Sequence, residues 1–269
     1  MALMNVQGVD INYADNGSGE ALVFMHGYTG SHNDWRNQVA ITVDSYRTIA
    51  VDHRGHGGSS APGDPSDYTI RIFAEDVYEL LTKLGIQRYC LIGHSMGGFM
   101  ALQSALDHPE GLRGLILVDT SSGEWDTAPG YAEFKARLHE IAKTEGLEAA
   151  FEYDAENNPV RVEKFKKHPE LREIARHKVL NTSLDGFIHV ANSFGAWPPV
   201  TDRLNEISVP TLIVLGEEDA GFIRASKIMN ERIRNSELVV IENAGHNPHE
   251  ENIGVFNRAF LDFLPRIQW

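Results

Sequence analysis

The alternation of short apolar runs with helical patterns is the feature that most restricts the folds open to this chain of 269 residues. Strand-length apolar runs lie at 21–27, 46–52, 89–93, 114–119, 211–216 and 237–242. Within these runs polar and apolar residues do not alternate, which is typical of strands buried on both faces of a sheet. Helical patterns separate the runs. The sequence therefore predicts an α/β fold with a mostly parallel, doubly wound sheet and helices on both faces.

The helical patterns are clearest at 70–84, 96–110 and 252–266. In the first of them, apolar residues recur at the 3.6-residue spacing of an amphipathic helix, and Gly85 follows as a stop signal. The other two segments each contain a proline at or near the end, where it cannot continue a helix. The opening segment 4–17 has the pattern of an antiparallel hairpin, which we expect to lead into the sheet.

The alternation stops over residues 120–204, where helical segments follow one another without a convincing strand. We therefore expect a core formed by residues 1–119 and 205–269, interrupted by a helical cap at 120–204. The charged stretch 162–178 mixes both signs and predicts a solvated helical face. The aromatic content of the insertion is close to the 9% of the whole chain and gives no sign of an aromatic cage.

Charge and hydropathy restrict the partners and the compartment. The formal net charge is -14, with no cluster of Lys and Arg that would suit a nucleic-acid backbone. We find no apolar stretch long enough to span a membrane and no signal-peptide pattern at the start, so we expect a cytoplasmic protein with neither nucleic-acid nor membrane partners. The single cysteine, Cys90, is expected to be an inert buried thiol. The sequence leaves open whether the chain forms a homodimer.

The segment Gly93–His94–Ser95–Met96–Gly97 falls where a predicted strand ends and a predicted helix begins. This is the context of a nucleophile elbow, a tight turn that projects a serine hydroxyl above the sheet edge. Such a turn requires small residues two positions before and after the serine, and both positions are glycine. The backbone N–H of Met96, at the positive end of the helix, would face a developing oxyanion.

A serine hydroxyl is a poor nucleophile at neutral pH and needs a base, which in turn needs an orienting acid. Asp219 and His246 each follow a predicted strand, and the carboxyl ends of such strands are where open α/β sheets carry their sites. Asp119, at the end of another strand, is the alternative acid and otherwise a structural residue that binds backbone N–H groups. His249 is expected to be an ordinary loop residue.

These motifs together resemble the α/β-hydrolase superfamily, and the chain resembles a capped member of it over nearly its whole length. The order serine, acid, histidine is the order of that superfamily. The loop 52–59, DHRGHGGS, is similar to the family pattern D-x-R-G-x-G-x-S. The other motifs that carry the resemblance are the elbow at Ser95, Asp219 after the penultimate strand, Gly245–His246 after the last strand, and the pair His26–Gly27.

The resemblance implies further roles near the serine. The N–H of Tyr28 would be the second oxyanion donor beside that of Met96, while His26 and Gly27 would support the loop that carries it. Tyr28 and Trp35 are expected to line the pocket or the core. No metal is expected, because the twelve histidines show no H-E-x-x-H or other tight ligand spacing.

The expected function is a cofactor-free serine hydrolase that cleaves a small to medium carboxylic ester through an acyl-enzyme. Haloalkane dehalogenases and epoxide hydrolases of this fold place an aspartate where this chain has Ser95. Lactonases, carbon–carbon bond hydrolases and the lyase-type synthase of menaquinone biosynthesis share the Ser-Asp-His set and remain alternatives. His94 and Asn247 differ from the residues usual in carbon–carbon hydrolases. A ligand receptor with residual hydrolase activity is the alternative from another functional class.

Overall fold

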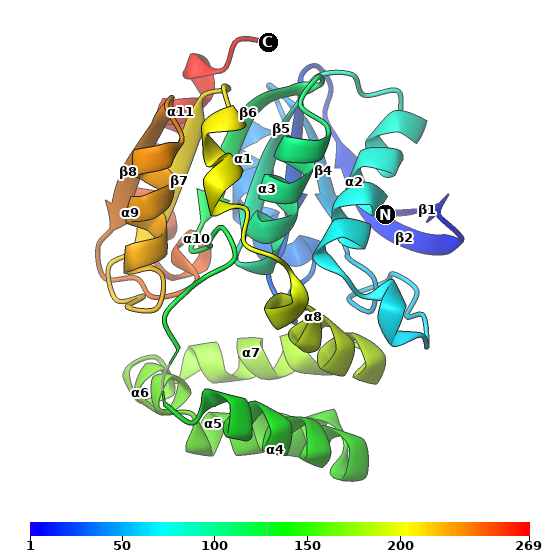
Figure 1. The fold of residues 1–269 in the computed structure, drawn as a ribbon, viewed down its shortest axis with the longest axis vertical. Coiled ribbons are helices and arrows are strands. Elements are labelled where there is room, and N and C mark those ends of the chain that lie inside the picture. The colour runs from blue at the N-terminus through cyan, green and yellow to red at the C-terminus, as the bar shows by residue number, and fades with distance from the viewer. Residues whose placement is uncertain (128) are drawn as a thin grey trace.

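The computed structural model describes residues 1–127 and 129–269. Eight strands form one sheet in the order β1-β2-β4-β3-β5-β6-β7-β8 (Figure 1). The pairs β1–β2 and β2–β4 are antiparallel, and the remaining neighbours are parallel. The strands are β1 Ala2–Val6, β2 Val9–Asn16, β3 Ala21–Met25, β4 Arg47–Val51, β5 Tyr89–His94, β6 Leu112–Val118, β7 Thr211–Gly216 and β8 Ser236–Ile241.

Helices cover both faces of this sheet. Figure 1 shows α2, α3 and α9 on the near face, and one hydrophobic cluster joins them to the strands. On the other face α11 packs its phenylalanines against a second cluster. The core helices are α1 Arg36–Thr42, α2 Ile70–Lys83, α3 Met96–Asp107, α9 Ile223–Arg232, α10 Pro248–Glu251 and α11 Ile253–Phe263. The predicted doubly wound α/β fold, including its opening hairpin, is confirmed.

The six predicted strands all form, but they are not equally buried. Every residue of β3, β5 and β7 is buried, as expected for strands covered on both faces. The expectation is wrong for β8, where most residues are only partly buried and Val240 is exposed. The reason is its position, because β8 is the last strand of the sheet and has a neighbour on one side only.

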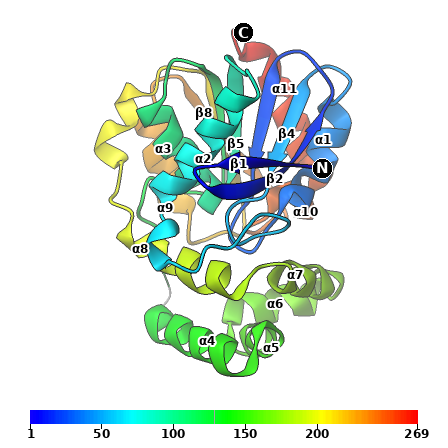
Figure 2. The same ribbon diagram turned by 90° about the vertical axis from the view of Figure 1, so that its right-hand side faces the viewer.

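Four helices follow β6 along the chain and lie together beyond the carboxyl ends of the strands. We call them the outer layer: α4 Tyr131–Glu145, α5 Leu147–Asn157, α6 Pro159–Lys167 and α7 Glu170–Leu180. Figures 1 and 2 both place this layer below the sheet. It has its own hydrophobic cluster, which includes Phe151, Phe165 and Val179. A π-helical turn, Gly186–Val190, and α8 Ala191–Ala196 lead back toward the core.

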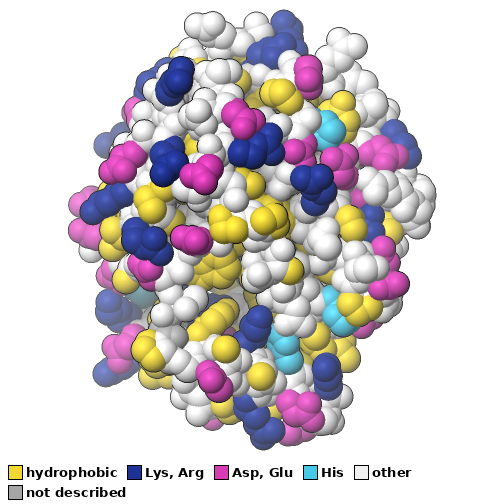
Figure 3. Space-filling view, viewed as in Figure 1, with side chains coloured by type: hydrophobic (Ala, Val, Ile, Leu, Met, Phe, Trp, Pro, Cys, Tyr) yellow, Lys and Arg dark blue, Asp and Glu magenta, His cyan; other side chains and the backbone are white. Residues whose placement is uncertain are grey.

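Charged side chains of both signs are interspersed over the face shown in Figure 3. This distribution matches the sequence, in which 24 Lys and Arg are spread among 38 Asp and Glu. Among the helices that the structure describes, none combines the length and apolar character needed to cross a membrane. Cys90 is buried as predicted, and burial raises the pKa of its thiol well above the usual value.

The structure corrects the expectation that His249 is a loop residue. Its side chain is fully buried in the short helix α10 and stacks on Trp35, with ring centroids 4.4 Å apart. The backbone carbonyl of His249 accepts a hydrogen bond from the Gln38 side chain of α1. The pattern near the C-terminus did not reveal this burial, because it depends on α10 packing against a helix more than 200 positions earlier in the chain.

We expect the buried His249 to make the fold sensitive to acid. Burial lowers the pKa of the His249 imidazole to about 4. In the unfolded chain this imidazole binds a proton near pH 6.5, whereas in the folded chain it stays neutral until about pH 4. The free energy of unfolding therefore decreases as the pH falls from 6.5 toward 4. From pH 7 to pH 5 this histidine alone should cost about 2 kcal/mol of unfolding free energy. The variant His249→Phe, which keeps an aromatic ring on Trp35, should have a correspondingly flatter dependence.

Urea unfolding of both proteins at pH 7 and pH 5 measures the difference directly. An identical loss of stability in the wild type and in His249→Phe would contradict the assignment of His249 as a neutral buried residue.

Candidate active site

Ser95 lies in a strained turn between β5 and α3. Its backbone angles are φ 51° and ψ -115°, a region that residues other than glycine adopt rarely and at a cost of about 1–3 kcal/mol. Hydrogen bonds on both sides hold the turn: Ser95 N–H donates to the carbonyl of Val118 at 2.9 Å, and the Thr120 hydroxyl donates to the carbonyl of Ser95 at 2.7 Å. The conformation is therefore imposed by the neighbouring strand β6.

The glycines around Ser95 allow the strand and the helix to approach this closely. A side chain at Gly93 would overlap the backbone of Gly97, and one at Gly97 would overlap the carbonyl of Met25 in β3. Gly98 is equally crowded by Thr120. The small residues expected at positions 93 and 97 are thus required by contacts with α3 and β3, and Gly98 is required by the segment that follows β6.

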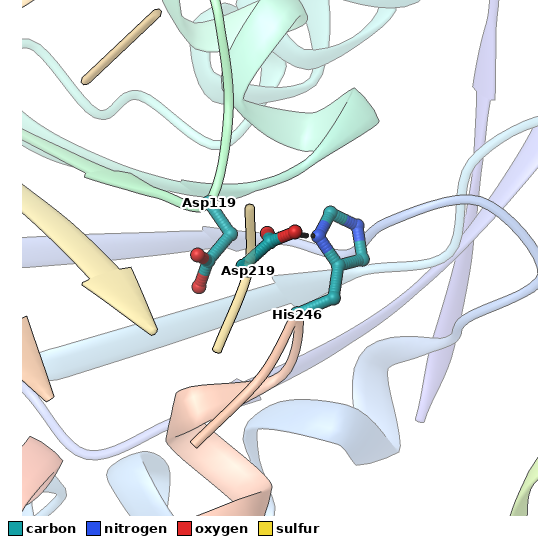
Figure 4. A group of neighbouring side chains, drawn as sticks. All are labelled: Asp119, Asp219 and His246. Carbon is teal, nitrogen blue, oxygen red and sulfur yellow. Dashed lines mark hydrogen bonds and ion pairs between the residues drawn. The ribbon is translucent and has the colours of Figure 1, made fainter. Parts of the chain in front are cut away.

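The structure brings Ser95, His246 and Asp219 into one hydrogen-bonded series. His246 Nε2 lies 3.0 Å from Ser95 Oγ, and His246 Nδ1 lies 2.7 Å from Asp219 Oδ2. Figure 4 shows the second of these bonds. The His246 side chain is 36% exposed and that of Asp219 is 13% exposed. A substrate can therefore reach the imidazole, whereas the carboxylate behind it is largely shielded from water.

This geometry suits general-base activation of the serine. With Nδ1–H donating to the Asp219 carboxylate, the tautomer that leaves Nε2 free to accept the Ser95 proton is favoured. The carboxylate would also stabilise the imidazolium that forms on proton transfer. The two distances lie in the range expected of an activated nucleophile and its oriented base.

Asp119, the alternative acid, is fully buried behind Asp219 (Figure 4). Its Oδ1 accepts a hydrogen bond from Gly216 N–H at 2.9 Å, at the end of the adjacent strand β7. Burial, and then the neighbouring charge of Asp219, raise the pKa of the Asp119 carboxyl well above its usual value. In this structure the imidazole of His246 is bonded to Asp219 and not to Asp119.

The loop after β3 carries the other predicted residues. A Cβ placed on Gly27 would touch the Cβ of Ser95, so this loop passes directly beside the elbow. Among the described residues, no acceptor is bonded to the N–H of Tyr28 or to that of Met96. Both N–H groups thus remain free to bind an oxyanion.

His26 joins this loop to the segment 52–59. The ring is fully buried, with Nδ1 at 2.7 Å from the carbonyl of Gly27 and Nε2 accepting from His53 N–H at 3.1 Å. Burial is the main cause that lowers the pKa of His26 well below its usual value, so the ring is neutral. It therefore connects two loops by one donated and one accepted bond.

Aromatic side chains from several segments gather beside the serine and the histidine. Phe222 stacks on His246 with centroids 5.0 Å apart and lies 6.2 Å from Trp125. Trp125 in turn stacks on Phe99, and Phe194 packs against both of them edge-on. Two of these residues, Trp125 and Phe194, belong to the segment whose composition gave no sign of an aromatic cluster. The cluster was missed because it is assembled across the core and the insertion.

His94 binds the backbone of the turn that carries His246, a role that the sequence did not indicate. Its Nε2 lies 2.6 Å from the carbonyl oxygen of His246, and its burial lowers the pKa of the ring well below the usual value. The neutral ring therefore donates Nε2–H to the backbone of the histidine turn. The pattern GHSMG placed His94 beside Ser95, but it did not reveal which backbone group the ring would meet.

A metal ion was not expected from the sequence. In the described part of the chain, Asp119, Asp219 and His246 form a group whose potential ligand atoms all lie within 4.8 Å of one another. Asp219 and His246 are bonded to each other, and Asp119 Oδ1 accepts from Gly216. The other carboxyl oxygen of Asp119, Oδ2, is buried without a hydrogen-bond partner among the described residues.

The comparison with protein families gives a match to the alpha/beta hydrolase fold over residues 20–140. A Bacillus subtilis protein provisionally named 2-succinyl-6-hydroxy-2,4-cyclohexadiene-1-carboxylate synthase is 31% identical over 97% of this chain and 96% of its own length. The 3-oxoadipate enol-lactonase 2 of Acinetobacter baylyi is 29% identical over 98% of this chain and 96% of its own.

Solved structures show the same relationship. A thermophilic esterase from Thermogutta terrifontis superposes with a TM-score of 0.84 at 28% identity, covering 98% of both chains. The esterase therefore shares the fold over nearly the whole chain, and the names of these three proteins describe different reactions.

Replacing each aspartate by asparagine should separate the two carboxyl groups. We expect Asp219→Asn to lower kcat by roughly 10⁴ with little change in Tm, because the imidazole loses the partner that selects its tautomer. Asp119→Asn should retain most of the activity, since an amide oxygen can still accept from Gly216 N–H and the imidazole keeps its bond to Asp219. Steady-state kinetics and thermal unfolding of both variants provide the measurement. The opposite pattern, with Asp119→Asn inactive in a folded protein, would make Asp119 the acid.

Proposed function

The chain belongs to the α/β-hydrolase superfamily, and from this premise we propose that it is a cofactor-free serine hydrolase that cleaves uncharged carboxylic esters through an acyl-enzyme. The observation that carries the proposal is the series Ser95–His246–Asp219, with bonds of 3.0 Å and 2.7 Å. A serine in a strained elbow, a free imidazole nitrogen and a shielded carboxylate are the parts that acyl transfer to serine requires.

In the proposed reaction, Ser95 Oγ attacks the ester carbonyl carbon while His246 Nε2 accepts the hydroxyl proton. The N–H groups of Tyr28 and Met96 bind the oxyanion of the tetrahedral intermediate, each contributing about 3 kcal/mol to the transition state. Protonated His246 then returns the proton to the leaving alcohol. Water attacks the acyl-enzyme by the same route in reverse and releases the acid.

The aromatic side chains beside His246 support an uncharged, apolar substrate. Phe222, Trp125 and Phe99 form a continuous stacked series that starts at the imidazole. Burying a carboxylate against such a surface without a cationic partner is costly, whereas an alkyl or aryl group gains free energy from the contact. We therefore infer a small to medium ester whose groups next to the carbonyl are hydrophobic.

Two relatives carry names that suggest other substrates for the same residues. A lactone is a cyclic ester, so the proposed attack by Ser95 applies to it unchanged, and lactone hydrolysis is the second candidate. The synthase and the lactonase are both named for carboxylate compounds, which the aromatic surface suits less well than an uncharged lactone. A receptor that keeps only residual hydrolysis would differ from all of these by its very slow turnover.

Labelling with a fluorophosphonate should test the nucleophile. We expect one adduct per chain, located at Ser95 by peptide mass spectrometry, because the Ser95 hydroxyl is bonded to a histidine that a carboxylate orients. Ser95→Ala should take up no label and should lower kcat by roughly 10⁴ to 10⁶. Folded wild-type protein that shows no adduct would disprove the nucleophile assignment.

A matched substrate panel should test the inferred specificity. We expect p-nitrophenyl butyrate and benzoate to be hydrolysed with higher kcat/KM than the p-nitrophenyl half-ester of succinic acid, which carries a free carboxylate. γ-Lactones of similar size test the second candidate, and Ser95→Ala provides the blank. EDTA should leave every rate unchanged. Faster cleavage of the charged half-ester, or activity that EDTA removes and a metal restores, would argue against the proposal.

A further inference from the structure

The turn that carries His246 is held at the backbone on both sides of the histidine. The carbonyl of His246 accepts from His94, as described above. On the other side, Gly245 N–H donates to Glu251 Oε2 at 2.6 Å. Glu251 is the last residue of α10, so its side chain folds back over the turn that begins its own helix. The position of the imidazole therefore depends on where the Glu251 carboxylate is held.

The partner that holds this carboxylate comes from the outer layer. Lys164 Nζ of α6 forms an ion pair with Glu251 Oε1, across 87 positions of sequence. The two side chains are only 18% and 11% exposed. Glu251 Oε2 is thus bound by the turn, whereas Oε1 is bound by Lys164 of α6 and, at 3.4 Å, by the Asn247 side chain. Burial alone would raise the pKa of Glu251, but Lys164 and Gly245 N–H bring it below its usual value.

Most residues of 162–178 are exposed, as expected of a solvated helical face, but two lysines depart from this pattern. Lys164 and Lys178, at the two ends of this stretch, both point into the interface with α10. Lys178 bonds to Glu250 at 2.6 Å and to Asp34 at 3.2 Å. Among the described residues, Glu250 and Asp34 make no hydrogen bond to Gly245 or His246, whereas Glu251, the partner of Lys164, binds Gly245 N–H. The two lysines are therefore similarly buried, but only Lys164 is linked to the histidine turn.

We propose that Glu251 is a positioning residue for His246 and that Lys164 is its counter-ion, so that the docking of α6 on the core sets the geometry of the proposed base. The inference rests on the proposed function, because it gives the outer layer a part in catalysis besides covering the site. Lys164 acts only through Glu251 and Gly245, and neither side chain is bonded to the reacting atoms.

The physical argument is the cost of a buried carboxylate without a partner. Without Lys164, the Glu251 carboxylate would lose its only cationic partner among the described residues, and it would move toward water or more closely toward the Asn247 amide. Either movement loosens its bond to Gly245 N–H, one residue before His246. A shift of the imidazole by a fraction of an ångström weakens proton transfer from Ser95 while leaving substrate binding nearly intact.

The test compares Lys164→Met with the matched control Lys178→Met. Both lysine side chains are 18% exposed, and both pair with α10. Four quantities are measured for each protein. They are the exchange rate of the Gly245 amide by NMR, the rate constant for fluorophosphonate addition at Ser95, and kcat and KM for p-nitrophenyl butyrate. Lys164→Arg tests rescue by a residue that keeps the charge.

We expect Lys164→Met to speed exchange at Gly245 and to lower both kcat and the labelling rate constant roughly 10-fold, with KM nearly unchanged. Lys164→Arg should recover most of the loss. Lys178→Met should lower Tm but leave Gly245 exchange and kcat per folded molecule unchanged. The double variant Glu251→Gln/Lys164→Met should have a kcat no lower than that of the slower single variant. Both substitutions act through the same hydrogen bond, that between Glu251 and Gly245 N–H.

Unchanged exchange at Gly245 in Lys164→Met would overturn the proposal, and so would faster exchange without slower labelling. Equal losses of kcat in the two methionine variants would also overturn it, because they would show only general stabilisation by the outer layer. A wild-type protein that takes no fluorophosphonate and hydrolyses no ester would instead refute the proposed function, while the Gly245 exchange rates would still report whether Lys164 holds the turn.

Discussion

The parallel register of β5, β6, β7 and β8 is the constraint on which the candidate site depends. Parallel neighbours end at the same edge of a sheet, so the turns after β5, β7 and β8 meet although they are far apart in the sequence. Ser95, Asp219 and His246 occupy these three turns. Because β6 and β7 separate β5 from β8, the turn after β8 must reach back along the sheet edge to bring His246 to Ser95. Side-chain hydrogen bonds then set the final geometry.

Backbone anchors keep the three turns from relaxing. Ser95 retains its strained angles because Val118 and Thr120 bind its peptide groups. The carbonyl of His246 is bound by His94, and the preceding N–H is bound by Glu251. Such bonds hold the side chains in the geometry of reaction before a substrate binds, and this preorganisation is a major way in which proteins lower reaction barriers.

The outer layer contributes more than a cover. Its α6 and α7 insert Lys164 and Lys178 among carboxylates of the core, and the described part of the preceding segment brings Trp125 to the aromatic cluster beside His246. The names of the relatives describe different reactions, although the chains are similar over nearly their whole length. Variation in this layer would change both the surface that meets the substrate and the contacts behind the histidine turn, without altering the sheet.

The sequence by itself determined the fold class, the strands and the principal helices, because burial on both faces and the 3.6-residue period leave local patterns. It also pointed to Ser95, Asp219 and His246, since each follows a predicted strand. Only the tertiary structure decided that Asp119 turns to Gly216, that His249 is buried on Trp35, and that Lys164 reaches Glu251. These contacts join segments distant in the chain, and no local period or spacing encodes which partners will meet when helices pack against a core.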